Sequence, residues 1–208
     1  ECLYCNLYSK QYVLDCGGPF LMTPILGIMA SAISGNLSGV SYDSIATVTV
    51  GSGGTPSISF TSIPATYKHL QIRGIISNNA ANYAKINMNS DTGANYTQHA
   101  LAGNGTSASA AATGASTAFI AMGRPDYLGR SGTSIFSGFI MDILDYANTN
   151  KYKTTRTLIG WDQNGGGSIN FESGLWMSTS AVNSITFVPT GVNNWIEYTS
   201  LALYGIKG

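Results

Sequence analysis

Short runs of residues with a period of two constrain the fold more than any other feature of this sequence. The alternation begins at Ser44, and similar runs recur to the C-terminus, each bounded by residues that favour turns. Successive side chains of a β-strand point to opposite faces, so this period predicts strands. The predicted strands are Ser44–Val50, Ser57–Ser62, His69–Ser77, Lys85–Asn89, Thr97–Ala102, Ser116–Met122, Phe136–Leu144, Thr154–Trp161, Ile169–Met177, Ser184–Val188 and Glu197–Tyr204. Many short strands with almost no helix predict an all-β fold, an antiparallel β-sandwich or jelly roll with an extended N-terminal arm.

Glycine and asparagine separate these runs. Gly51–Gly54, Asn78-Asn79, Gly103–Gly105 and Asn164–Gly167 offer residues that tolerate positive φ, as tight connections require. We interpret Gly51–Gly54 and Gly165–Gly167 as hairpin turns, because neither opens an amphipathic helix or carries the Lys-Ser/Thr of a phosphate-binding loop. The loops are expected to form the functional ends of the sandwich.

The segment Gly103–Ser116 consists mainly of Ala, Ser, Thr and Gly. Such a segment has little apolar surface to bury. It is predicted to be a long mobile loop, or a segment that becomes ordered only against a neighbouring subunit.

The first forty residues differ from the rest and are predicted to form an extension and apolar anchoring arm, followed by the β domain at 41–208. All three cysteines, Cys2, Cys5 and Cys16, lie there, so the β domain needs no disulfide. Cys2 and Cys5 have the spacing of metal ligands, but His69 and His99 lie far along the chain. A zinc site needs four ligands, so no metal site is expected.

Residues 1–21 allow two further interpretations. Cys16–Pro19 precede Met22, and two glycine codons at that place can encode a ribosome-binding sequence, so residues 1–21 would be upstream reading frame. Alternatively, Lys10 precedes an apolar stretch that ends in small residues at Ala30–Ala32, as in a secretory signal, although Asp15 and Pro19 interrupt that stretch.

The apolar segment 23–33 lies outside any strand pattern and is too short and interrupted to span a membrane. It must be buried, either against the domain or in a partner. The expected assembly anchor is Pro24, Ile25, Leu26, Ile28, Met29 and Ile33.

Charge is sparse. Ten acidic and ten basic residues make up 10% of the chain, whereas roughly a quarter is usual. Such a surface suits a protein fixed in an assembly, because soluble monomers carry a denser charge coat. Nucleic-acid binding is not expected, because phosphate contacts need clustered cations and only Lys151, Lys153 and Arg156 lie close together.

No catalytic constellation is evident. Acyl transfer would need a nucleophile beside His69 or His99, which we interpret as strand-surface residues, and no Gly-x-Ser-x-Gly motif is present. A glycosidase pair would have to come from Asp142, Asp145, Asp162, Glu172 or Glu197. Asp142 and Asp145 are the closest pair, but a solvated strand end explains them better, and neither an enzyme nor a cofactor is expected.

Aromatic residues near loops and strand ends suggest glycan binding as a different function. Stacking on sugar rings would be possible there, although sandwich cores also use aromatic residues heavily. The candidates are Tyr83, Tyr96, Tyr127, Tyr146, Tyr152, Trp161, Trp176 and Trp195. A host-surface glycan therefore remains a potential partner.

Several passages resemble a family of small structural proteins encoded by marine and cyanobacterial tailed bacteriophages. These passages are Met22–Ser31, Tyr42–Gly54, Ile63–Gly74, Asp142–Arg156, Ser173–Ser180 and Ala202–Gly208. The resemblance covers residues 22–208 and supplies no catalytic residues.

The resemblance implies a structural protein on the virion surface, assembled in the host cytoplasm. The favoured role is a fibre-type protein for host attachment, expected to be a homotrimer that binds other virion proteins through its arm. One alternative is a capsid decoration or cement protein that stabilises the shell. Another is a glycan-binding or glycan-degrading module.

Overall fold

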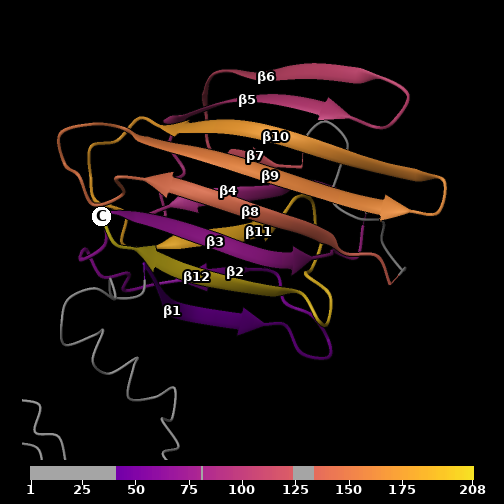
Figure 1. Ribbon diagram of the computed structural model, residues 1–208, viewed down its shortest axis with the longest axis horizontal. Coiled ribbons are helices and arrows are strands. Elements are labelled where there is room, and N and C mark those ends of the chain that lie inside the picture. The colour runs from indigo at the N-terminus through magenta and orange to yellow at the C-terminus, as the bar shows by residue number, and fades with distance from the viewer. Residues whose placement is uncertain (1–40, 81, 124–133) are drawn as a thin grey trace, which may run out of the picture. The chain divides into compact units, whose positions relative to one another are not determined.

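The computed structural model describes residues 41–80, 82–123 and 134–208, and every regular element in those ranges is a β-strand. The strands are β1 (Tyr42–Thr49), β2 (Ile58–Phe60), β3 (His69–Ile76), β4 (Ala84–Met88), β5 (Tyr96–Gly103), β6 (Ala108–Thr117), β7 (Ile120–Met122), β8 (Ser137–Leu144), β9 (Lys153–Gln163), β10 (Gly166–Trp176), β11 (Ile185–Pro189) and β12 (Ser200–Ile206). The predicted all-β sandwich is confirmed, and Figure 1 shows its two layers.

The connectivity is that of a jelly roll. One sheet has the order β1-β12-β3-β8-β9-β10-β5-β6, and the other has the order β2-β11-β4-β7. Without β5, β6, β9 and β10, the remaining eight strands form two four-stranded sheets, and the chain crosses between them at nearly every connection. Eight strands in two antiparallel sheets with this alternation define the jelly roll.

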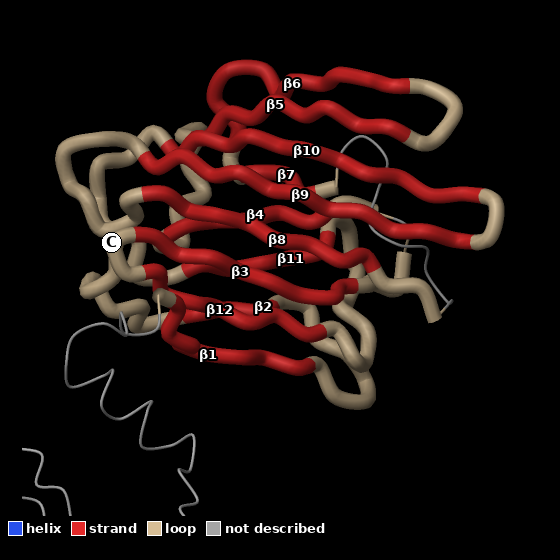
Figure 2. The backbone as a smooth tube through the Cα atoms, viewed as in Figure 1, coloured by secondary structure: helices blue, strands red, loops and turns tan. Residues whose placement is uncertain are grey.

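Two hairpins are inserted into this frame. The β5–β6 hairpin lies between β4 and β7 in the sequence, and the β9–β10 hairpin lies between β8 and β11. Both add to the β8 edge of the same sheet, which therefore grows from four strands to eight. Their turns lie at the same end of that sheet (Figure 2).

Two predictions about the connections were wrong. Residues 108–117 form strand β6, which pairs with β5 from Tyr96↔Thr117 to Gly103↔Ala108, so Gly103–Ser116 is not one long loop. Gly51–Gly54 joins β1 to β2 in the other sheet and is not a hairpin turn. Gly165, with φ of 86°, does form the predicted hairpin turn between β9 and β10.

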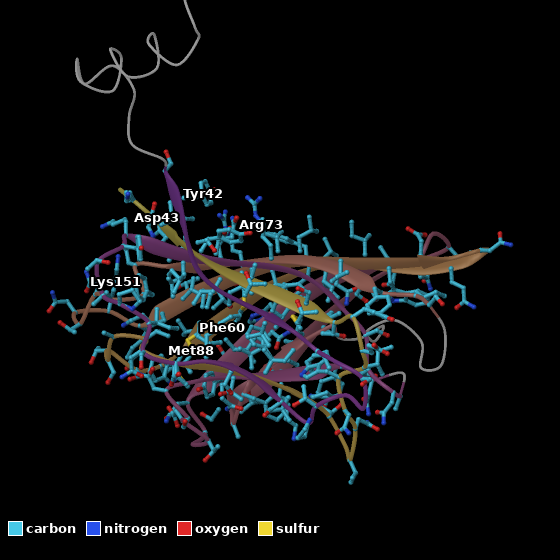
Figure 3. All side chains as sticks on the ribbon, turned by 90° about the horizontal axis from the view of Figure 1, so that it is seen from below. Tyr42, Asp43, Phe60, Arg73, Met88 and Lys151 are labelled. Atoms are coloured by element: carbon cyan, nitrogen blue, oxygen red, sulfur yellow. The ribbon has the colours of Figure 1, made fainter. Side chains whose placement is uncertain are left out.

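The core lies between the two sheets and is built by the alternating inward residues. Leu70 and Ile72 of β3 and Phe187 of β11 are fully buried. Figure 3 shows Phe60 and Met88 between the sheets, whereas Tyr42 and Arg73 project from the opposite side of the larger sheet. The larger sheet therefore has an inner face that packs on the core and an outer face that does not.

The inner face becomes polar where the larger sheet extends past the core. Gln98 and Glu172 are each 2% exposed. The Gln98 Oε1 accepts a hydrogen bond from the Ala121 amide at 2.6 Å, and the Glu172 Oε1 accepts one from the Gly123 amide at 2.8 Å. These bonds satisfy backbone groups around β7 and hold the inserted hairpins against the smaller sheet.

Candidate binding surfaces

A row of apolar side chains crosses the outer face of the larger sheet. Strand register places Leu101, Phe171, Leu158 and Ile140 opposite one another in that order on β5, β10, β9 and β8. We call these four residues the apolar row. Leu101 is 57% exposed, Phe171 is 52% exposed and Leu158 is 44% exposed. Alternation directs these residues outward because their neighbours along each strand point into the fold.

The apolar surface extends beyond the row. Ile169 lies two residues from Phe171 on the same strand and is 57% exposed. A groove of about 500 Å³ runs beside the row between β10, β5 and β6, with Phe171, Leu101 and Ala110 in its walls. Apolar patches of a few hundred Å² are often functional surfaces.

The next row along the outer face is polar and includes Gln71, Asp142 and Arg156, whereas Arg73 lies opposite Ile140 in line with the apolar row. Asp142 accepts hydrogen bonds from Gln71 at 2.7 Å and from Arg156 at 3.2 Å. Arg73 donates to the Gln71 Oε1 at 2.6 Å, and its guanidinium lies 5.5 Å from the centre of the Tyr42 ring. Asp142 and Arg156 therefore neutralise each other on this face, and the Arg73 guanidinium packs between Gln71 and Tyr42.

The two carboxylates that the sequence placed closest together are held by different cations. Asp145 accepts a hydrogen bond from Lys151 and lies 3.0 Å from the Lys68 Nζ, whereas Asp142 pairs with Arg156. The ammonium groups of Lys151 and Lys68 lower the pKa of Asp145 from 3.8 to about 2. A glycosidase acid needs a raised pKa, so Asp145 is unsuited to that role.

The histidines occupy the strand positions expected for them. His69 is the first residue of β3, and its Nδ1 accepts a hydrogen bond from the Asp145 backbone amide at 2.9 Å. That bond requires an unprotonated Nδ1. His99 is exposed on the outer face of β5, opposite Ser173 of β10.

The clustered cations do not form a basic patch. Lys153 is fully buried at the start of β9. Its Nζ donates to the backbone carbonyls of Asn148 at 2.7 Å, Lys151 at 2.8 Å and Thr179 at 3.1 Å. Burial lowers the pKa of this ammonium group. Lys153 therefore holds the β8–β9 and β10–β11 connections together.

A second candidate surface lies at the tips of the inserted hairpins. A hollow of about 740 Å³ is lined by residues 103–105 and 160–169 together with Phe136, and we call it the hairpin trough. The residues that line it include Trp161, Asp162, Gln163 and Asn164. Trp161 and Asp162 are consecutive on β9, so their side chains point to opposite faces of the sheet. The trough therefore lies at the ends of the inserted hairpins, and residues of β9, β10 and the β5–β6 turn form its walls.

Local bonds fix parts of the trough. The Asn104 Oδ1 accepts hydrogen bonds from the amides of Thr106 at 3.0 Å and Ser107 at 2.8 Å, which sets the β5–β6 turn. Trp161 is partly buried, and its indole N–H has no acceptor among the described residues. Gly167 lies so close to Asp162 that a Cβ there would be 2.6 Å from the Asp162 Oδ1.

The aromatic candidates divide into core and surface residues. Tyr96, Tyr146, Trp176 and Trp195 are buried, so for these four the structure supports the core interpretation and not sugar stacking. Trp176 stacks on Tyr96 at 6.3 Å and donates to the Asp91 carboxylate at 2.7 Å. Tyr152 is 51% exposed, and Tyr83 and Trp161 are partly buried. Tyr127 lies outside the described residues.

Other predictions concern residues outside the described part of the chain. The assembly anchor, Pro24, Ile25, Leu26, Ile28, Met29 and Ile33, lies outside the described residues, as do the three cysteines. Within the described ranges, no three His, Cys, Asp or Glu side chains gather as a metal site would require. The same ranges include no helix with the length and apolarity to cross a membrane.

Comparison with known proteins gave no relatives. No protein-family model matches the chain, and neither the curated proteins nor the solved structures include a detectable match.

Proposed function

We propose that this chain is a non-enzymatic structural protein of a tailed-phage virion, of the fibre type, exposed on the particle surface and used in host attachment. The apolar row on the outer face of the larger sheet is the observation that carries the proposal. A chain with so few charges that also exposes such a row is suited to a place inside an assembly.

A second copy of the same chain is the partner that this face fits. Leu101, Leu158, Phe171 and Ile169 are each about half exposed and Ile140 is partly buried, so the patch presents on the order of 400 Å² of apolar surface in all. A stable interface removes about 800 Å² from each partner, with an apolar centre and a polar rim. The Asp142 and Arg156 pair supplies part of such a polar rim. We propose a homo-oligomer on these grounds, and the fibre-type role favours a homotrimer.

The jelly-roll topology is compatible with this role. The same architecture occurs in viral capsid and lectin domains. That is an analogy at the level of the fold, because one fold supports many functions. In the proposed arrangement, residues 22–40 attach the chain to other virion proteins, and the hairpin tips face away from the particle.

A capsid decoration or cement protein is the second candidate. The described residues form a sandwich without a coiled-coil shaft or fibrous repeat, and an apolar sheet face could also lie across capsomers. Both candidates place the apolar row in a protein interface, and they differ in where on the particle that interface lies.

Cryo-electron microscopy of intact particles tests the proposal directly. Density for this sandwich at the tail or at a protruding tip is the expected result. Density tiled over the capsid lattice would favour the decoration role and remove host attachment. Particles that contain none of this chain by mass spectrometry would overturn both candidates.

A further inference from the structure

Asn164 lies in the turn at the tip of the β9–β10 hairpin, and we propose that it is a site of spontaneous deamidation in the folded chain. Asn-Gly pairs occur twice in the sequence, as Asn164-Gly165 in this turn and as Asn104-Gly105 in the turn between β5 and β6. The fold protects the second pair and leaves the first reactive. The product, aspartate or isoaspartate, adds a negative charge to the hairpin tip as the chain ages. This chemistry is independent of where the chain lies on a particle.

Deamidation of asparagine needs only the next backbone amide and water. The Gly165 nitrogen attacks the Cγ of Asn164, so that a C–N bond forms and a succinimide ring closes. The bond from Cγ to the side-chain NH2 group breaks, and this group takes up the proton lost by the Gly165 nitrogen and leaves as ammonia. Water then opens the ring. Cleavage between the ring nitrogen and Cγ gives aspartate, whereas cleavage between that nitrogen and the main-chain carbonyl carbon gives isoaspartate.

The glycine at position 165 gives the attacking nitrogen access to Cγ. Glycine has no Cβ to crowd the ring that closes beside it. A Cβ at Gly165 would meet nothing within 4 Å, and Asn164 and Gly165 are both exposed, so the ring has room and water reaches it. The Gly165 amide lies in the turn between the paired residues Gln163 and Gly166 and donates no hydrogen bond to a described residue. No such bond therefore has to break before this nitrogen reacts.

The asparagine side chains of the two pairs differ in their hydrogen bonds. Asn104 and Gly105 are also exposed, and Gly105 has the same φ of 86° as Gly165. The Asn104 Oδ1, however, accepts hydrogen bonds from the amides of Thr106 at 3.0 Å and Ser107 at 2.8 Å, and from the Ser107 hydroxyl at 3.3 Å. Ring closure moves the side-chain carbonyl onto the nitrogen of the next residue, so these turn bonds would have to break first. The side chain at position 164 forms no hydrogen bond with another described residue.

The β9–β10 tip also extends beyond the neighbouring strands of the sheet (Figure 1). β8 pairs with β9 only as far as Gly160, and β5 pairs with β10 only from Ile169 onward, so residues 161–168 pair with one another alone. A two-stranded ribbon is marginally stable by itself, and its end opens readily. β5, in contrast, is paired with β10 up to Gly103, directly before the other Asn-Gly turn. The backbone rotation that ring closure needs is therefore easier at position 164 than at position 104.

Conversion changes the charge of the hairpin trough and of the whole chain. Asp162 is the one ionisable side chain among the described residues that line the trough, so conversion of Asn164 adds a second carboxylate there. The chain has ten acidic and ten basic residues, so the converted form is net acidic at neutral pH and separable by ion exchange. Isoaspartate also lengthens the main chain by one carbon atom within the turn. A partner that contacts these tips therefore meets a different surface on aged chains.

Peptide mass spectrometry of the folded full-length chain measures conversion at each pair. The chain is incubated at mildly alkaline pH in water labelled with heavy oxygen, which marks only the residues converted during the incubation, and is then digested at acidic pH. Asn164 is expected to convert at least tenfold faster than Asn104. In denaturant the turns are lost, and the two rates are expected to become similar because both pairs then present the same Asn-Gly bond.

Two matched variants assign the change in charge. Asn164→Gln is expected to remove the acidic form that ion exchange separates from the aged native chain, because a glutamine would have to close a larger ring and does so much more slowly. Asn104→Gln is the control and is expected to leave the acidic form. Both positions are exposed, so neither variant should unfold the chain.

Three outcomes would overturn the proposal. The first is that Asn104 converts as fast as Asn164 in the folded chain. The second is that Asn164 stays unconverted in the folded chain while both pairs convert in denaturant. The third is that the acidic form persists in N164Q.

Discussion

Asp145 shows how one side chain can determine the response of the fold to acid. It follows β8 with a positive φ of 47°, and two lysines from different connections converge on its carboxylate. Its backbone amide is also bound by the His69 ring. Asp145 therefore ties the end of β8 to the start of β3 through both backbone and side chain.

Acid should weaken the fold through this residue. The pKa of Asp145 is about 2 in the fold and 3.8 when unperturbed, so the unfolded chain binds the proton more readily. Its stabilising contribution is complete above 3.8 and is lost as the pH falls towards 2. Denaturant unfolding at a series of pH values is expected to show this loss.

Asp145→Asn should reduce the free energy of unfolding at neutral pH and flatten its decline below pH 4. Asp162→Asn is the control, since Asp162 is exposed and forms no ion pair with a described residue. An unchanged acid profile in D145N would show that other carboxylates govern the acid response.

At the scale of single elements, the sequence predicted the strands well but missed β6. All eleven predicted runs overlap a strand of the structure, because half-buried strands carry the period-two pattern that was used to find them. β6 carries no such pattern. Its alanines and serines are mostly exposed, and its order comes from the ladder of backbone bonds to β5.

The candidate surfaces were predictable only in part. Trp161 was among the aromatic candidates, but nothing local distinguished it from Trp176, which packs in the core. The two rings differ in burial because different strands pack against them in the folded protein. The apolar row could not be predicted, because it joins residues from four strands whose order in the sheet is set by tertiary pairing.

Two glycines in the larger sheet should respond differently to alanine. A Cβ on Gly205 of β12 would lie 2.3 Å from the Tyr67 ring, whereas a Cβ on Gly138 of β8 would meet nothing within 4 Å. Gly205→Ala is expected to lower the free energy of unfolding by about 1–3 kcal/mol, since overpacking displaces the ring. Gly138→Ala should raise it by about 0.4–1 kcal/mol, because an alanine that fits the native backbone reduces the freedom of the unfolded chain.

Denaturant unfolding of the two variants measures this difference. Equal stability of G205A and G138A would mean that Tyr67 moves freely and does not pack on β12.

At the scale of the whole molecule, the outer face of the larger sheet is expected to determine the oligomeric state. Phe171→Glu with Leu158→Glu would place two carboxylates in the centre of the proposed interface, where unpaired charges cost several kcal/mol each. We expect the native chain to sediment as a trimer and the double variant as a monomer. Both side chains are about half exposed, so the variant should remain folded.

Val192→Glu is the control for this experiment. Val192 is fully exposed in the loop between β11 and β12, away from the apolar row, so V192E should keep the trimer. A native chain that sediments as a monomer at all concentrations would contradict the proposed interface.

The two inserted hairpins place the variable turns of the sheet away from the eight strands of the jelly roll. The hairpins are inserted at two distant points in the sequence, yet they lie side by side in the larger sheet. Of their four strands, only β9 pairs with a strand of the jelly roll, which is β8. The turns at their tips can therefore change in length and composition while the frame keeps its strand pairing. Selection for recognition of a new surface could therefore change the residues of these turns without changing the residues that form the jelly roll.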